Sequence, residues 1–191
     1  MKNRRRGQAA IWDNGTIKKI RAGLKSPCQR LIFEISLFTG ERIGAITQLK
    51  VSDIYDEHGL VLETITFSAS TRKATKHGSA STRQVPIHPD LLLHFERYSP
   101  PSHGFLFPSG SSSGHITPKA VDKYWRKILS DYGITGFSTH SSRRWVINSL
   151  RKTGISIVTI GELMGMSINT VRHYLDNDPT ECARAIATLS V

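Results

Sequence analysis

The chain has 191 residues, 38% of them hydrophobic, so it is long enough to bury one sizeable core and short for two full domains. Its 26 Lys and Arg residues against 15 Asp and Glu residues give a formal net charge of +11, which favours a polyanionic partner such as nucleic acid. No apolar run is long enough to span a membrane, and the basic start at residues 1–6 does not lead into the apolar stretch of a signal peptide.

The first part of the chain predicts three helices. Thr16 is predicted to cap a first helix over residues 16–24. Pro27 opens a second helix on which apolar residues recur at helical spacing, and Gly40 ends it. A short helix over residues 41–49 is predicted to follow, with its apolar side chains turned inward.

The middle of the chain predicts a hairpin. Residues 60–67 are rich in β-branched side chains and favour a strand, and residues 83–87 form a second strand that ends at proline. The hydrophilic residues 68–82 between them are typical of a hairpin tip. A helix over residues 91–98 is predicted next.

The last part of the chain predicts more helices after a long loop. Residues 99–117 are interpreted as a surface loop inside one domain, although residues 105–107 within it favour a packed strand. Pro118 begins the clearest helix, which runs to residue 132 with an apolar face of helical period. Further helices are predicted over 140–152, 156–164, 167–175 and 179–188.

Together these elements predict a mainly α fold with a small antiparallel β-sheet, an α+β domain. We expect this single domain over residues 16–191, after a basic and flexible N-terminal tail over residues 1–15. Cys28 and Cys182 are the only cysteines, too few for a disulfide framework and without Cys or His neighbours at metal-ligand spacing. We therefore expect two reduced thiols in a cytoplasmic protein.

Two segments in the first half of the chain carry groups suited to a phosphate. Thr39-Gly40-Glu41-Arg42 stands at a helix start, where backbone N–H groups attract anions and a guanidinium adds a two-pronged clamp. Lys73 and Lys76 stand on the hairpin tip, where a mobile lysine can protonate a leaving alkoxide. Taken singly, the first segment is better explained by an exposed structural arginine, and the second by a solvated charge run.

Two further segments lie near the C-terminus. His140 and Arg143 are spaced i, i+3, which puts imidazole and guanidinium on one side of a helical turn. Tyr174 lies on a short polar helix, and a phenol can attack a phosphodiester and keep the energy of the ester in a covalent link. Taken alone, such a histidine is more often a helix cap, and such a tyrosine more often packs.

The order of these groups resembles that of the tyrosine recombinase or phage integrase family, whose catalytic domain carries Arg, Lys, His-x-x-Arg and Tyr in the same order along the chain. The resemblance runs over residues 16–187. It extends to the sequences that flank the motifs, which include Leu49-Lys50-Val51-Ser52-Asp53-Ile54, Arg83-Gln84-Val85-Pro86-Ile87 and Glu162-Leu163-Met164-Gly165.

The resemblance implies a site-specific DNA recombinase that cuts and rejoins strands. By this likeness Tyr174 attacks the scissile phosphate, which forms a 3′-phosphotyrosyl link and frees a 5′-hydroxyl. Arg42 and Arg143 would hold the non-bridging oxygens. His140 would bond the phosphate or relay the tyrosine proton.

The same likeness implies the remaining partners of the reaction. Lys76, preferred to Lys73, would protonate the leaving 5′ oxygen, and neither a metal nor another cofactor is needed. The expected partners are double-stranded DNA and, during recombination, a homotetramer assembled on it, while the free protein is expected to be a monomer. We expect it in the cytoplasm, associated with the nucleoid.

The sequence departs from the family pattern at three points. Ala45 stands where the family usually has an acidic residue, and Met166 where it tends to have His or Trp. The N-terminal core-binding domain of the family is also expected to be absent. These departures keep open the alternative of a catalytically silent integrase-like DNA-binding or regulatory protein. A type IB topoisomerase, which shares the same chemistry and similar active-site residues, is a further alternative.

Overall fold

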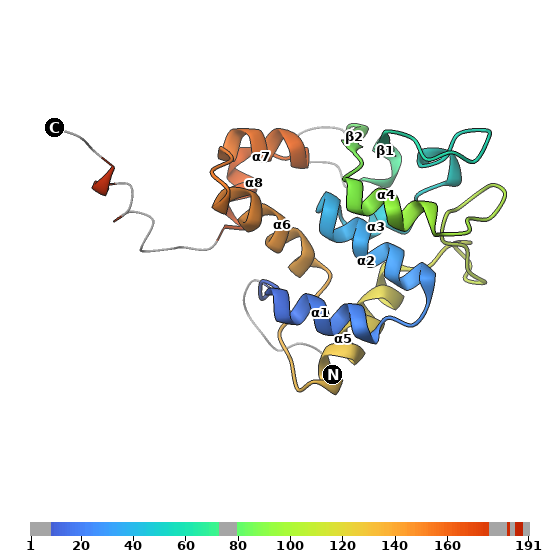
Figure 1. Ribbon diagram of the computed structural model, residues 1–191, viewed down its shortest axis with the longest axis horizontal. Helices are drawn as coiled ribbons and strands as arrows, with labels where there is room; N and C mark the ends of the chain where they lie inside the picture. The colour runs from blue at the N-terminus through green and yellow to red at the C-terminus, as the bar shows by residue number, and fades with distance from the viewer. Residues whose placement is uncertain (1–8, 73–79, 176–182, 184–185, 189–191) are drawn as a thin grey trace.

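The computed structural model describes residues 9–72, 80–175, 183 and 186–188 (Figure 1). It contains a two-stranded antiparallel sheet among helices, which confirms the predicted mainly α fold. The elements are α1 (Asn14–Gly23), α2 (Pro27–Thr39), α3 (Ile43–Ile46), η1 (Val51–Asp53), β1 (Thr64–Phe67), η2 (Ala69–Thr71), β2 (Arg83–Pro86), α4 (Pro89–Glu96), α5 (Pro118–Asp131), α6 (His140–Lys152), α7 (Ile157–Met164) and α8 (Ile168–Arg172).

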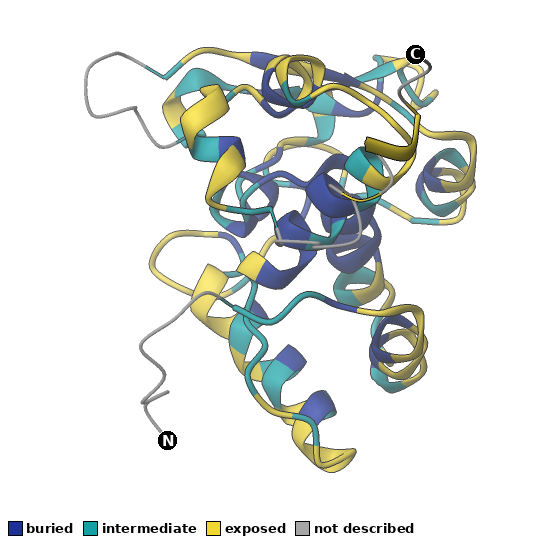
Figure 2. Ribbon diagram, turned by 90° about the vertical axis from the view of Figure 1, so that its left-hand side faces the viewer, coloured by how far each residue is buried: buried dark blue, intermediate teal, exposed yellow. Residues whose placement is uncertain are grey.

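Helix α2 runs through the centre of the molecule, where Figure 2 shows the buried residues gathered. It packs against α3, α4 and α6. It begins at Pro27 and ends before Gly40, as predicted, and Gly40 is left-handed with φ +59°. A Cβ at Gly40 would be strained by this conformation and would also crowd Cε of Met164 at 2.5 Å, so glycine is favoured at the end of α2.

Two predictions about the first helices need correction. The prediction that Thr16 caps the first helix is wrong, because the carboxylate of Asp13 accepts a hydrogen bond from the Thr16 backbone N–H at 2.6 Å and α1 begins at Asn14. The helix predicted over residues 41–49 is reduced to α3, because Arg42 is extended and precedes the helix as its N-cap.

The sheet is formed by the two antiparallel strands on either side of the predicted hairpin tip. Strands β1 and β2 pair in a register that sets Phe67 opposite Arg83. The strand predicted over residues 60–67 begins later than expected, since Val61 forms an isolated bridge with Tyr55 instead of joining the ladder. In β2 the burial alternates, which turns Arg83 toward the interior.

Two hydrophobic clusters form the core. The larger one joins α1, α2, α4 and α5 and contains Trp12, Phe33 and Trp125, whose ring centroids lie 5.2–5.5 Å apart. Such aromatic pairs contribute about 0.5–1.5 kcal/mol each beyond their buried area. The smaller cluster joins α6, α7 and α8 around Ile147. Trp145 packs against both clusters and thereby links the two parts of the core.

The loop predicted over residues 99–117 carries a packed segment, but not a regular strand. Phe105 forms an isolated bridge with Lys50, and Leu106 and Phe107 are fully buried.

Near the start of α2, burial raises the pKa of the Cys28 thiol to about 11. None of the described helices is both long and apolar enough to cross a membrane.

Some predictions fall outside the described residues. They concern Cys182 and most of the helix expected over residues 179–188.

Candidate active site

A cavity of about 250 Å³ opens between α3, α5 and the start of α6. It brings together three of the five predicted site residues, which come from distant parts of the chain. Its wall is formed by Arg42, Ile43, Gly44, Ala45, Thr71, Pro118, Thr139, His140 and Arg143.

Helix α6 supplies both members of the predicted His-x-x-Arg pair to this cavity. His140 is the first residue of the helix and is exposed, whereas Arg143 is only 1% exposed and lies one turn further in. The start of α6 is attached to α5, since the Thr139 backbone N–H donates to a carboxylate oxygen of Asp122 at 3.3 Å. The pair therefore lines one wall from mouth to interior, as its spacing predicts.

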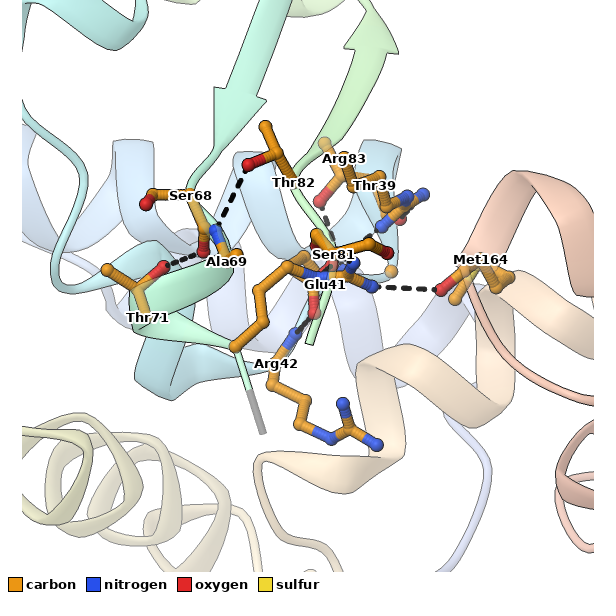
Figure 3. A network of polar contacts seen from close by, with 12 residues as sticks. Thr39, Glu41, Arg42, Ser68, Ala69, Thr71, Ser81, Thr82, Arg83 and Met164 are labelled. Atoms are coloured by element: carbon orange, nitrogen blue, oxygen red, sulfur yellow. Dashed lines mark hydrogen bonds and ion pairs between the residues drawn. The ribbon is translucent and has the colours of Figure 1, made fainter. Parts of the chain in front are cut away.

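Arg42 reaches the same cavity from the turn between α2 and α3. Its backbone N–H donates to Oε1 of Glu41 at 2.8 Å, and in Figure 3 its side chain extends away from the Glu41 carboxylate. Ala45, which stands where the family usually has an acid, also lines the cavity and is buried. Position 45 therefore contributes no carboxylate to this wall.

Tyr174 does not line the cavity, but it lies against a residue that does. Its ring centroid is 5.8 Å from Cζ of Arg143, a cation–π contact, and it is half-buried against the smaller core cluster. Its backbone carbonyl accepts hydrogen bonds from Nδ2 of Asn148 at 2.8 Å and Nε of Arg144 at 3.4 Å. These bonds attach the segment after α8 to α6.

The predicted lysines cannot be placed in the same way. Lys76 and its alternative Lys73 lie outside the described residues. Thr71, which shortly precedes them, lies in the cavity wall.

A buried carboxylate stands next to the cavity, on Glu41 (Figure 3). Oε1 of Glu41 accepts from Nη1 of Arg143 at 3.3 Å, and Oε2 accepts from Nη1 of Arg83 at 2.9 Å and lies 3.3 Å from Nε of Arg72. Among the described residues, three guanidinium groups thus contact one carboxylate and leave an excess of positive charge beside the cavity.

Burial and charge act in opposite directions on this group. Burial raises the pKa of the Glu41 carboxyl, but the charges of Arg143, Arg83 and Arg72 and the Arg42 backbone N–H outweigh it, so this pKa lies below its ordinary value. Burial lowers the pKa of Arg143 to about 10, against the opposing effect of Glu41. Arg143 is therefore charged at neutral pH, and an anion in the cavity would stabilise that charge.

Two of the three guanidinium nitrogens of Arg143 donate hydrogen bonds within the described residues, and the third does not. Its Nη1 donates to the carbonyl of Gly40 at 2.9 Å, and its Nη2 donates to the carbonyl of Met164 at 3.4 Å. Its Nε is buried and has no hydrogen-bond partner among the described residues. A buried, unpaired N–H is costly unless a ligand accepts from it.

Local sequence pattern does not indicate that Glu41, Arg72 and Arg83 meet. Glu41 belongs to the Thr-Gly-Glu-Arg segment, and Arg72 lies within the predicted hairpin tip over residues 68–82. One signal was present: in the predicted strand, Arg83 shares the inward face with Val85, and a buried arginine requires an acid. Which acid provides it could not be read from local spacing.

A second hollow, of about 570 Å³, lies between α1, α2 and α4. Its wall includes Arg21, Arg30, Glu34, Asp90, His94 and Arg97, but none of the predicted site residues. The described residues contain no group of three His, Cys, Asp or Glu side chains placed to hold a metal ion.

Comparison with known protein families finds a match over most of the chain. The sequence profile of the phage integrase family matches residues 17–181. A search of curated protein sequences finds no match.

The chain is similar in structure to several solved proteins. It is 20% identical to the integrase from mycobacterium phage Brujita, with a TM-score of 0.65 over 96% of this chain and 58% of that one. For XerH site-specific recombinase bound to palindromic difH substrate the identity is 20% and the TM-score is 0.68, over 98% of this chain and 55% of the XerH chain. For the catalytic domain of bacteriophage HP1 integrase they are 21% and 0.63, over 95% of both chains.

These values establish a shared fold. The chain spans between 55% and 58% of the Brujita and XerH chains and 95% of the HP1 catalytic domain.

Proposed function

Because this chain belongs to the phage integrase family, we propose that it is a site-specific DNA recombinase that cleaves and rejoins strands through a 3′-phosphotyrosyl link at Tyr174. The observation that carries the proposal is the cavity with Arg42, His140 and Arg143 in its wall. Residues 16–191 would form the catalytic domain. Solved structures with the same fold include a site-specific recombinase bound to its substrate and a transposon integrase in complex with DNA, which supports double-stranded DNA as the partner.

The electrostatics of the cavity favour a phosphodiester as its ligand. The guanidiniums of Arg42 and Arg143 would each hold a non-bridging oxygen, and the unpaired Nε of Arg143 is a donor that such an oxygen satisfies. The same groups would stabilise the charge that builds up when phosphorus becomes five-coordinate. Because this charge is larger in the transition state than in the bound substrate, the arginines would raise the rate as well as the affinity.

The chemical step balances without a cofactor. The oxygen of the Tyr174 phenol forms a bond to phosphorus while the bond from phosphorus to the 5′ oxygen breaks. The phenol proton would pass by way of His140, or His140 would bond the phosphate, and Lys76 would give a proton to the leaving oxygen. Attack of a 5′-hydroxyl on the phosphotyrosine reverses the sequence, and joining to a partner strand within a homotetramer would complete recombination.

The test is to trap the covalent intermediate. The protein is incubated with nicked duplexes tiled across the DNA that flanks its gene, and adducts are separated on a denaturing gel. We expect an adduct with a free 5′-hydroxyl from the wild-type protein and from Tyr132→Phe, a matched loss of a hydroxyl at an exposed tyrosine. We expect none from Tyr174→Phe.

Two results would overturn the proposal. One is an adduct that survives Tyr174→Phe. The other is DNA binding by the wild-type protein with no adduct on any duplex, which would favour the catalytically silent relative suggested by Ala45 in the cavity wall.

A further inference from the structure

We propose that Glu41 is a positioning residue for strand cleavage, whose buried carboxylate orients the guanidinium of Arg143 toward the cavity and fixes the end of α7 through Arg72. The inference rests on the proposed recombinase function. It assigns to the residue before Arg42 a part in the reaction that does not involve contact with DNA.

The guanidinium of Arg143 is held through two of its three nitrogens. Nη1 is held by the carboxylate of Glu41 and the carbonyl of Gly40, and Nη2 by the carbonyl of Met164. A guanidinium is planar and rigid, so occupying these edges determines where Nε points. Glu41 is the one charged partner in this set and is therefore the strongest restraint on the plane.

The end of α7 is linked to the same arginines through the carbonyl of Met164. The carbonyl of Met164 accepts from Nη2 of Arg143 at 3.4 Å and from Nη2 of Arg72 at 3.5 Å. Arg72 is in turn 3.3 Å from Glu41, and its Nη1 donates to the carbonyl of Ser81 at 2.7 Å. Glu41 therefore joins α6, the end of α7 and the hairpin in one polar network with a buried carboxylate at its centre.

The network also contacts the proposed nucleophile, Tyr174, through Arg143. The Tyr174 ring packs on the Arg143 guanidinium at 5.8 Å, and α8 follows α7 directly. A shift of Arg143 would displace both a phosphate-binding donor and the surface on which the proposed nucleophile rests. Misplacement by about 1 Å at a reacting centre can lower a rate by about 100-fold.

The experiment compares Glu41→Gln with Glu34→Gln in single-turnover cleavage of the nicked duplexes. Glu34 is an equally buried carboxylate paired with an arginine, Arg21 at 2.6 Å, but it lies outside the 250 Å³ cavity. We expect Glu41→Gln to cleave about 10- to 100-fold more slowly with DNA affinity within about threefold of wild type. Glu34→Gln should cleave at the wild-type rate when both are assayed well below their unfolding temperatures.

A second substrate separates positioning from general loosening of the fold. In a methylphosphonate duplex, a methyl group replaces one charged oxygen of the scissile phosphate, so less charge is left for Arg143 to stabilise. If Glu41 acts through Arg143, the ratio of wild-type to Glu41→Gln rates is smaller on this duplex than on the phosphate. A merely structural role leaves the ratio equal on both.

The outcomes distinguish this inference from the function beneath it. No adduct from the wild-type protein overturns both. The positioning role alone is overturned if Glu41→Gln cleaves at the wild-type rate. It is also overturned if the ratio of wild-type to Glu41→Gln rates is the same on the two duplexes. Should Glu41→Gln fail to fold, Glu41→Asp takes its place, because it keeps the charge but draws the carboxylate back from Arg143. Slower cleavage with the smaller methylphosphonate ratio is then expected, and wild-type rates refute the role.

Discussion

Replacement of Glu41 by glutamine should lower the free energy of unfolding by about 3–5 kcal/mol at pH 7, the usual cost of leaving buried charges without their partner. Glu41 is 1% exposed, and three guanidinium groups lie within 3.3 Å of its carboxylate. Glutamine keeps the size of the side chain and can still accept from the Arg42 backbone N–H. The change therefore removes charge and little else.

The loss should depend on pH in a defined direction. The pKa of the Glu41 carboxyl is lower in the folded chain than its ordinary value of 4.5. Such a group stabilises the fold fully above the unfolded value, and this contribution disappears as the pH falls through the folded value. The gap between wild type and Glu41→Gln should thus be widest at neutral pH and should narrow below about pH 4.5.

Urea unfolding measured from pH 7 to about pH 3.5 tests both points. Glu34→Gln is the matched control, because its partner Arg21 is 44% exposed and can turn to water. Its loss should be about 1–2 kcal/mol. A gap below about 1 kcal/mol for Glu41→Gln at pH 7, or one that stays constant down to low pH, would refute the reasoning.

Three further predictions concern stability and binding. Gly165→Ala should destabilise by more than the about 1–2 kcal/mol of a left-handed alanine, because the new Cβ would lie 2.7 Å from Nη2 of Arg72. Gly133→Ala, also at positive φ but with open space around it, should lower the free energy of unfolding by the backbone strain alone. Equal losses for the two variants in urea unfolding would contradict the clash predicted at Gly165. Asp13→Ala should lower the free energy of unfolding by about 1 kcal/mol by removing the cap of α1, and an unchanged urea midpoint would contradict this role. DNA affinity, measured by fluorescence anisotropy, should fall on the order of 1,000-fold between about 50 and 200 mM salt, and a fall below about tenfold would argue against a phosphate-tracking surface.

The sequence by itself determined the elements whose ends are set by local chemistry. Pro27 and Pro118 begin helices because they lack an N–H that the first turn does not need, and Gly40 ends one because it adopts a left-handed conformation without strain. The ordered Arg, Lys, His-x-x-Arg and Tyr groups identified the family for the same reason, since each motif can be recognised from neighbouring residues. Local chemistry does not by itself determine a helix start where two residues can act as the cap, as Asp13 and Thr16 can before α1.

The tertiary structure alone decided which charged residues meet. Arg42, His140 and Arg143 reach one cavity because α2, α3 and α6 pack together, and Arg72, Arg83 and Arg143 share Glu41 across separations that no helical or strand period relates. A buried ion pair depends on desolvation and on the position of its partner in space, and neither quantity is a property of a sequence window. Local pattern therefore identified the candidate site residues, while packing selected the carboxylate that pairs with Arg143.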